Sequence, residues 1–261
     1  MRNRLKQRLD AGEVVIGSQL RFGVPAIVEL FGQAGFDFVT IDSEHAPQTP
    51  SGIQAQLQGL SSSDTTPIVR VPSSDPDVIR LYLDMGAVGV LAPFISNAGE
   101  AQRVAQACRY PPQGTRGYGP ARASRFGFDT DYFDQANDHV VCLVLIETAE
   151  AVANIDEIFA VEGVDSYIVG PFDLSISLGI PRQFDHPRFQ KAVETVFAAA
   201  KKAGKPPGMD MDAIPCTPET FEAPIRDGYK LILVDGDEWM LHAACKNMIE
   251  CFEQSKASLK R

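Results

Sequence analysis

The stretch VVCLVLIETAEAVANIDEIFAVEGVDSYIV, residues 140–169, decides the fold. It opens with an apolar run, Val140–Ile146, continues with a segment of helical period, Ala149–Phe159, and closes with a second apolar run, Ser166–Val169. A strand, a helix and another strand in this order form the repeating unit of a parallel sheet. The stretch therefore predicts one βα unit and the first strand of the next.

The same alternation extends along the whole chain. Eight apolar runs are predicted as strands: Val14–Leu20, Phe38–Asp42, Ile68–Val71, Gly89–Pro93, Val140–Ile146, Ser166–Val169, Pro207–Met211 and Leu231–Val234. The helices expected with them are Ala26–Gln33, Ser51–Leu60, Pro76–Met85, Gly99–Cys108, Ala149–Phe159, Pro187–Ala203, Pro218–Arg226 and Glu238–Gln254. Eight strands alternating with helices predict an α/β protein with a (β/α)8 or TIM barrel.

Length and composition agree with one barrel over residues 1–261. TIM barrels run to about 250 residues, and the 44% of hydrophobic residues can bury a large core. An open, doubly wound sheet would show the same alternation of strands and helices. However, no G-x-G-x-x-G follows a first strand, and the count of eight favours a closed barrel.

Charge and cysteine usage argue against several classes of protein. Nucleic-acid affinity comes mostly from Lys and Arg, so a net charge of −10 argues against it. There is no run of about eighteen apolar residues, and the basic start at Met1–Asp10 is not followed by an apolar secretion signal. The five cysteines are scattered, without C-x-x-C, so neither a disulfide framework nor a zinc knuckle is expected. We expect a cytoplasmic enzyme with no membrane partner.

The segment Tyr110–Asp138 interrupts the rhythm of strands and helices. It is rich in Gly, Pro, Arg and aromatic residues and is much longer than an ordinary connection in such a fold. Its glycine cluster, Gly114–Gly119, resembles a phosphate cradle but does not follow a strand. A lid or a contact between subunits is the preferred interpretation.

Two carboxylates follow neighbouring strands. Glu147 comes directly after Ile146, and Asp173 lies just beyond Val169. Catalytic groups of such barrels sit at the C-terminal ends of strands, and two carboxylates suit a hard cation such as Mg²⁺ or Mn²⁺, which would keep positions open for water and substrate. The alternative is that both acids merely stabilise the starts of the following helices.

Arg70 and His45 are the other candidates at strand ends. Arg70 follows an apolar strand, where it would face either a substrate anion or a mouth acid such as Asp42 or Glu44. His45 is three residues past Asp42, so that carboxylate could hold one ring nitrogen and leave the other as a base. The remaining histidines, His139, His186 and His242, are predicted to be structural or on the surface.

These residues resemble the HpcH/HpaI family of class II, metal-dependent 2-oxo-acid aldolases, whose barrels are of the phosphoenolpyruvate/pyruvate superfamily type. The family includes 4-hydroxy-2-oxoheptanedioate aldolases and 2-dehydro-3-deoxyglucarate aldolases. The resemblance covers nearly the whole chain. It is carried, in order, by GFDF (35–38), DSEHAP (42–47), VRVP (69–72), AP (92–93), YPPQGTRG (110–117), ARASRF (121–126), IET (146–148) and GPFDL (170–174).

The resemblance implies a role for each site residue. Glu147 and Asp173 would hold the metal, which could be Mg²⁺, Mn²⁺ or Co²⁺. Arg70 would stabilise an enolate oxygen, and His45 with Asp42 would move the hydroxyl proton. The other residues it implicates are Gly170, Pro171, Phe172 and Leu145 at the substrate, and Glu44, Asp84, Arg122 and Arg125 in support or at a subunit contact.

The resemblance also implies a homo-oligomer built from dimers, commonly a hexamer, in which paired subunits exchange the last helix. One departure is Leu145, because several relatives have Gln two residues before the metal-binding Glu. Loss of that polar contact bears on the substrate rather than on the reaction. The acids of Asp210-Met211-Asp212-Ala213, at the end of the seventh strand, are a second place where selectivity could be set.

The function expected is reversible cleavage of a 4-hydroxy-2-oxo acid into pyruvate, or a related 2-oxo acid, and an aldehyde. The enolate formed would be stabilised by the metal and Arg70. One alternative is a lyase for malyl-CoA or citramalyl-CoA, although the acidic chain shows no basic patch for the CoA phosphates. A catalytically silent metabolite-binding barrel is the other alternative, and the complete set of site residues argues against it.

Overall fold

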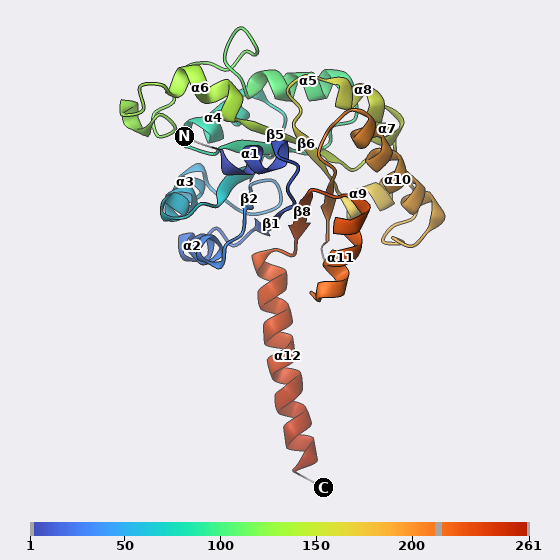
Figure 1. Ribbon diagram of the computed structural model, residues 1–261. Helices are drawn as coiled ribbons and strands as arrows, with labels where there is room; N and C mark the ends of the chain where they lie inside the picture. The colour runs from blue at the N-terminus through green and yellow to red at the C-terminus, as the bar shows by residue number, and fades with distance from the viewer. Residues whose placement is uncertain (1–2, 212–215, 260–261) are drawn as a thin grey trace.

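The computed structural model describes residues 3–211 and 216–259 and contains an eight-stranded parallel sheet (Figure 1). The strands are β1 Val15–Leu20, β2 Phe38–Asp42, β3 Thr66–Arg70, β4 Gly89–Ala92, β5 Val141–Ile146, β6 Ser166–Val169, β7 Gly208–Asp210 and β8 Leu231–Val234. Their order in the sheet is β6-β5-β4-β3-β2-β1-β8-β7, and every ladder is parallel. Each strand predicted from the sequence has its counterpart.

The two ends of this sheet, β6 and β7, lie against each other. Ser166 Oγ donates a hydrogen bond to the carbonyl oxygen of Pro206 at 2.7 Å. A Cβ atom on Gly208 would lie 1.8 Å from the carbonyl oxygen of Tyr167, so only glycine permits this approach. The strands therefore form a nearly closed barrel, which confirms the (β/α)8 prediction.

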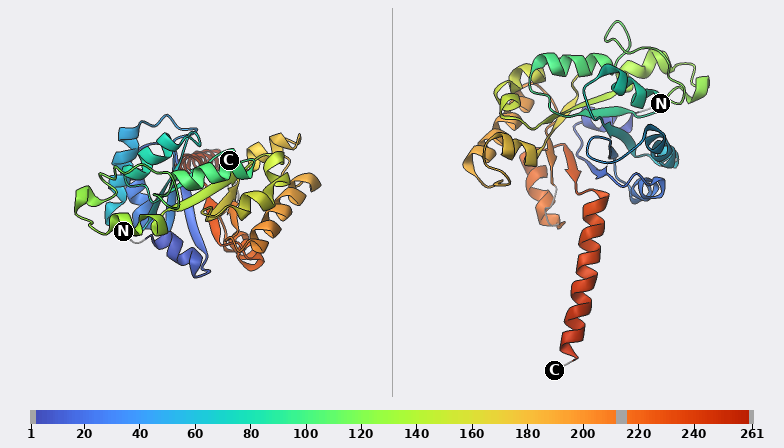
Figure 2. Two further views of the ribbon diagram at one scale, coloured as in Figure 1. Left: turned by 90° about the horizontal axis from the view of Figure 1, so that it is seen from above. Right: turned by 180° about the vertical axis from the view of Figure 1, so that it is seen from behind.

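Most of the helices surround the barrel (Figure 2). They are α1 Arg4–Asp10, α2 Pro25–Ala34, α3 Pro50–Gly59, α4 Pro76–Asp84, α5 Ala98–Ala107, α6 Tyr132–His139, α7 Ala149–Ala153, α8 Ile155–Ala160, α9 Pro171–Ser177, α10 Pro187–Lys202, α11 Pro218–Asp227 and α12 Asp237–Ser258. The expected helix Ala149–Phe159 is two helices, because Asn154 leaves helical geometry between them. Helices α1, α6 and α9 were not predicted.

Alternate residues of each strand serve two cores. On β5, Leu143 and Leu145 point into the barrel and join an interior cluster with residues such as Phe38 and Leu233. Val144 and Ile146 belong to the outer cluster, under the helices. This two-residue period fixes which side chains can reach the mouth of the barrel, because residues at successive positions face opposite sides.

Helix α1 closes the N-terminal end of the barrel. Its Leu5 and Leu9 are buried in the interior cluster. Its polar side chains contact residues that precede or begin strands: Lys6 pairs with Asp165, and Arg8 pairs with Asp37. The opposite, C-terminal end of the barrel is therefore the end available to a substrate.

Helix α12 projects from the barrel beyond the end of β8 (Figures 1 and 2). Asp237 is its only buried residue. Large apolar side chains are exposed along it, including Leu241, Met248, Ile249 and Phe252. Within the part of the chain that the structure describes, no helix has the length and apolar character needed to cross a membrane.

Replacing Leu5 by Ala should lower the free energy of unfolding by about 2–5 kcal/mol, because it opens a cavity in the barrel interior. Urea unfolding at one fixed protein concentration measures this loss. Leu30→Ala is the matched control, since Leu30 is 64% exposed and its truncation should have little effect. Equal losses for the two variants would show that α1 does not stabilise the barrel.

Candidate functional site

A cavity of about 270 Å³ opens at the C-terminal end of the barrel. Eight of the residues expected to act on the metal or the substrate contribute to its wall: His45, Arg70, Leu145, Glu147, Gly170, Pro171, Phe172 and Asp173. Gln19, Arg21, Leu91, Asp210, Leu233 and Trp239 line it as well. The carboxyl ends of the strands thus bring together residues that are far apart in the sequence.

Asp42 is fully buried beside this cavity and accepts six hydrogen bonds, three on each oxygen. Arg70 provides two of them, from Nε at 3.0 Å and from Nη2 at 2.6 Å. Burial alone would raise the pKa of Asp42, but the hydrogen bonds and the charge of Arg70 outweigh it, so the pKa lies below its ordinary value. Asp42 therefore remains ionised and fixes the guanidinium.

Arg70 therefore forms the internal salt bridge that was the alternative to binding a substrate anion. It nevertheless still lines the cavity. Its Nε also lies 3.3 Å from Glu44 Oε2. Nε and Nη2 make these contacts, so Nη1 has no hydrogen-bond partner among residues 3–211 and 216–259. A guanidinium held on one side by two carboxylates can still donate to a substrate oxygen from its other side.

His45 differs from expectation in its partner. Asp42 accepts the backbone N–H of His45 at 3.2 Å, and the structure shows no contact between this carboxylate and the imidazole. The ring instead has Nε2 3.7 Å from Glu44 Oε2, and the side chain is 53% exposed. The physical reason is that Asp42 already has three donors on each oxygen. Glu44, which was expected only as a supporting residue, is the acid beside the imidazole.

Glu147 follows directly after β5, and its side chain is buried. It accepts the backbone N–H of Phe94 at 2.6 Å, while Thr148, not Glu147, caps helix α7. The helix-capping alternative for Glu147 therefore does not apply. Burial raises the pKa of Glu147 to about 7, with the charges of Glu44 and Asp173 adding to the effect and the Phe94 N–H opposing it.

Asp173 lies in the first turn of α9, so its helix-start role and a ligand role can coexist. Gly170 stands between the two carboxylates in the chain, and a Cβ there would lie 2.9 Å from Glu147 Oε2. Two hard oxygen donors whose charges repel, one buried and one half-buried, fit a divalent cation. No group of three potential metal-ligating side chains occurs among the described residues, so this would be an open site completed by water or substrate.

Sequence reasoning missed the wall formed by β1 and the start of α12. Gln19, near the end of β1, and Arg21, directly after it, donate hydrogen bonds to Asp42 at 2.9 and 3.2 Å. Trp239 reaches the cavity from the first turn of α12. The signal that could have identified this wall was the pair of polar residues, Gln19 and Arg21, at the end of a largely apolar run.

Three predicted residues lie outside this cavity. Asp84 ends α4 and accepts a hydrogen bond from Arg116 at 2.6 Å, while Arg122 donates to the carbonyl oxygens of Met85 and Leu57. Arg125 is exposed in the long segment. The end of α4 leads into the start of β4, at the far end of the barrel. Within one subunit these residues do not meet the site, and their role at a subunit contact stays a prediction.

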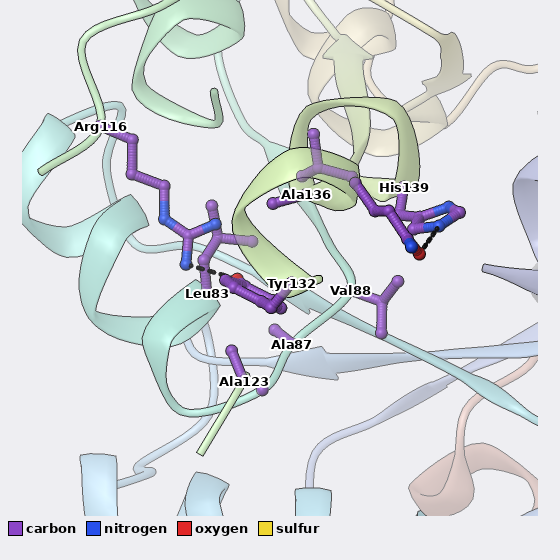
Figure 3. A pocket seen from close by; sticks show the side chains of 11 residues that line it. Leu83, Ala87, Val88, Arg116, Ala123, Tyr132, Ala136 and His139 are labelled. Carbon is purple, nitrogen blue, oxygen red and sulfur yellow. Dashed lines mark hydrogen bonds between the residues drawn. The ribbon is translucent and has the colours of Figure 1, made fainter. Parts of the chain in front are cut away.

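The long segment that carries Arg122 and Arg125 covers a second, smaller pocket (Figure 3). Leu83, Ala87, Val88 and Ala136 give it an apolar wall, and Arg116 donates to the Tyr132 hydroxyl at 3.1 Å. Its volume of about 40 Å³ is too small for a substrate, although a water molecule would fit. This pocket is a packing space, and the mouth of the barrel remains the candidate active site.

The part of the cavity wall that could set substrate selectivity contains both apolar and acidic side chains. Leu145 is buried, with 4% of its surface exposed, at the position where a polar residue was expected from relatives. Asp210 lines the same cavity from β7. Asp212 and Ala213, which were considered as selectivity residues, lie outside the described residues.

Comparison with known proteins shows the family to which the chain belongs. The family described as HpcH/HpaI aldolase/citrate lyase matches residues 22–212. The chain is 42% identical, over 79% of its length and 81% of the relative, to 5-keto-4-deoxy-D-glucarate aldolase of Citrobacter koseri. A solved HpcH/HpaI aldolase/citrate lyase family protein from Burkholderia cenocepacia J2315 has a TM-score of 0.89 at 33% identity, covering 96% of this chain and 99% of that one.

A solved citrate synthase, SbnG, has a TM-score of 0.88 at 28% identity and covers 98% of this chain and 100% of its own. Its similarity extends over almost the whole of both proteins, like that of the Burkholderia structure. The aldolases among the relatives are carbon–carbon lyases, and the present chain is an aldolase of this kind. The chain belongs to the HpcH/HpaI aldolase/citrate lyase family.

Proposed function

We propose that the protein cleaves 4-hydroxy-2-oxo acids reversibly into pyruvate and an aldehyde. The observation that carries this proposal is that one cavity contains two carboxylates from neighbouring strands, Glu147 and Asp173, together with Arg70 and His45. A divalent cation held by the two carboxylates would supply a Lewis acid for the oxygens of the 2-oxo acid.

The protein's own residues account for the movement of charge. His45 accepts the proton of the C4 hydroxyl, the C3–C4 bond breaks, and its electron pair forms the enolate of pyruvate while C4 becomes the aldehyde carbon. Arg70, fixed by Asp42, donates hydrogen bonds to the enolate oxygen as its negative charge develops. Protonation of C3 then releases pyruvate. Glu44 Oε2 lies 3.7 Å from Nε2 of this imidazole.

We propose in addition that the protein is an oligomer in which α12 packs against a second copy. Leu241, Cys245, Met248 and Phe252 recur at spacings that place them on one face of the helix. All four are exposed in the single chain. A helix of 22 residues that leaves the barrel has little else to bury this face.

Glu147→Gln should reduce pyruvate release from a 4-hydroxy-2-oxo acid by at least about 100-fold, because a charged metal ligand is lost. Lactate dehydrogenase coupling measures the pyruvate. Glu150→Gln is the control, since Glu150 is an exposed acid in the first turn of α7 and should keep the activity. Full activity of Glu147→Gln after treatment with a chelator would contradict the proposed mechanism.

The affinity for Mn²⁺ should depend on pH through Glu147. A carboxyl group must lose its proton before it binds a metal, and the pKa of Glu147 is raised to about 7. Affinity should therefore rise about ten-fold per pH unit up to about pH 7 and level off above about pH 8. Isothermal titration calorimetry from pH 5.5 to 8.5 tests this. A constant affinity below pH 7 would show that Glu147 does not compete for a proton and the metal.

Replacing Met248 and Phe252 by Glu should reduce the mass of the particle in solution, because charges on the apolar face of α12 oppose its burial. Light scattering coupled to size-exclusion chromatography measures this mass. Gln254→Glu adds a negative charge on another face of the helix and should leave the assembly intact. An unchanged mass for the double variant would exclude this face of α12 as the subunit contact.

A further inference from the structure

We propose that Arg21 selects substrates whose aldehyde half ends in a carboxylate. This inference rests on the aldolase function proposed above and names the substrate class. Arg21 follows directly after β1 and lines the same cavity as Glu147 and Asp173. The cavity therefore contains two guanidinium groups, those of Arg21 and Arg70, and the reaction as described uses only Arg70.

The order of strands places Arg21 across the mouth from the metal-binding carboxylates. In a ring of eight strands, β1 lies opposite β5, which is followed directly by Glu147, and β8 lies opposite β4. The 2-oxo acid end of the substrate would be held at β5 and β6. The far end then extends toward β1 and the start of α12, where Arg21 and Trp239 form the wall.

The surroundings of Arg21 already bind a carboxylate. Its Nη1 lies 2.8 Å from Glu238 Oε1, and its Nε lies 3.2 Å from Asp42 Oδ2. The Glu238 side chain is 36% exposed, so it can turn into solvent when a substrate carboxylate takes its place. Asp42 is fully buried and cannot be displaced in this way. Glu238 therefore marks the position at which an incoming carboxylate would be recognised.

The backbone at this position is fixed, which suits a role in selection. Asp237 accepts the backbone N–H groups of Arg21 at 2.9 Å and of Phe22 at 3.1 Å. The Arg21 side chain is 27% exposed, compared with 9% for Arg70. Arg21 thus faces the open part of the mouth, whereas Arg70 belongs to its buried part.

The test compares acids of equal chain length that end in a carboxylate or in a methyl group. The probes are 4-hydroxy-2-oxoheptanedioate with 4-hydroxy-2-oxoheptanoate, and 4-hydroxy-2-oxopentanedioate with 4-hydroxy-2-oxopentanoate. For each pair, kcat/KM of the dicarboxylate is divided by kcat/KM of the methyl-ended acid, and both values are measured with the full-length, metal-loaded enzyme. Circular dichroism and thermal unfolding establish that each variant is folded.

Arg21→Met should lower this ratio about 10- to 100-fold for the pair whose length fits, as expected for hydrogen bonds to a charged group. The change should lie mainly in KM, because the far carboxylate is bound equally in the ground and transition states. Arg21→Lys should restore part of the ratio, and Glu238→Gln should raise it by removing the competing carboxylate. Arg226→Met is the control, since Arg226 is exposed on α11.

Each other outcome counts against the inference. If Arg21→Met lowers kcat/KM for both members of a pair by the same factor, Arg21 acts only by holding Asp42 or α12. A wild-type enzyme that cleaves the methyl-ended acids as efficiently as the dicarboxylates would overturn the inference as well. If the wild-type enzyme cleaves none of the four acids, the proposed function itself is wrong and the inference falls with it.

Discussion

The buried ion pair between Asp42 and Arg70 is the interaction on which the rest of the site depends. The two residues are partners in the register of β2 and β3, so the barrel itself brings them together. A fully buried carboxylate is costly unless charges and hydrogen bonds compensate it. Arg70 and Arg21, together with Gln19 and two backbone N–H groups, provide this compensation. Asp42 therefore positions both guanidinium groups, and with them the cationic side of the mouth.

On the opposite side of the mouth, a buried carboxyl group lies near other acids and lacks such compensation. Glu147 is buried close to the charges of Glu44 and Asp173, and among the residues that the structure describes its only hydrogen-bond donor is the backbone N–H of Phe94. Burial and repulsion both favour the protonated form, and a cation would reverse that preference. The cavity is thus divided between fixed positive charges at β1 to β3 and carboxylates that need a cation at β5 and β6. A substrate with an anionic 2-oxo acid end matches this division.

The sequence was informative wherever a residue's place follows from strand periodicity. Glu147, Asp173, Arg70 and His45 end or follow apolar runs, and the barrel brings all four into one cavity. Contacts that depend on competition among side chains could not be predicted in the same way. The imidazole lies beside Glu44 because Asp42 is saturated, and Arg21 reaches the mouth because of its partners on α12. Helix α1 was missed because a helix of seven residues with two apolar positions, Leu5 and Leu9, carries little periodic signal.

The central claim is that this mouth stabilises the enolate of pyruvate. Exchange of the pyruvate methyl protons with D2O, followed by NMR spectroscopy, measures enolate formation without any need to know the aldehyde. The Mg²⁺-loaded wild-type protein should catalyse this exchange. The exchange should be lost in the Glu147→Gln variant and after the metal is removed by a chelator. Exchange that continues at the wild-type rate under both of these conditions, or its absence in the loaded wild-type protein, would contradict the account.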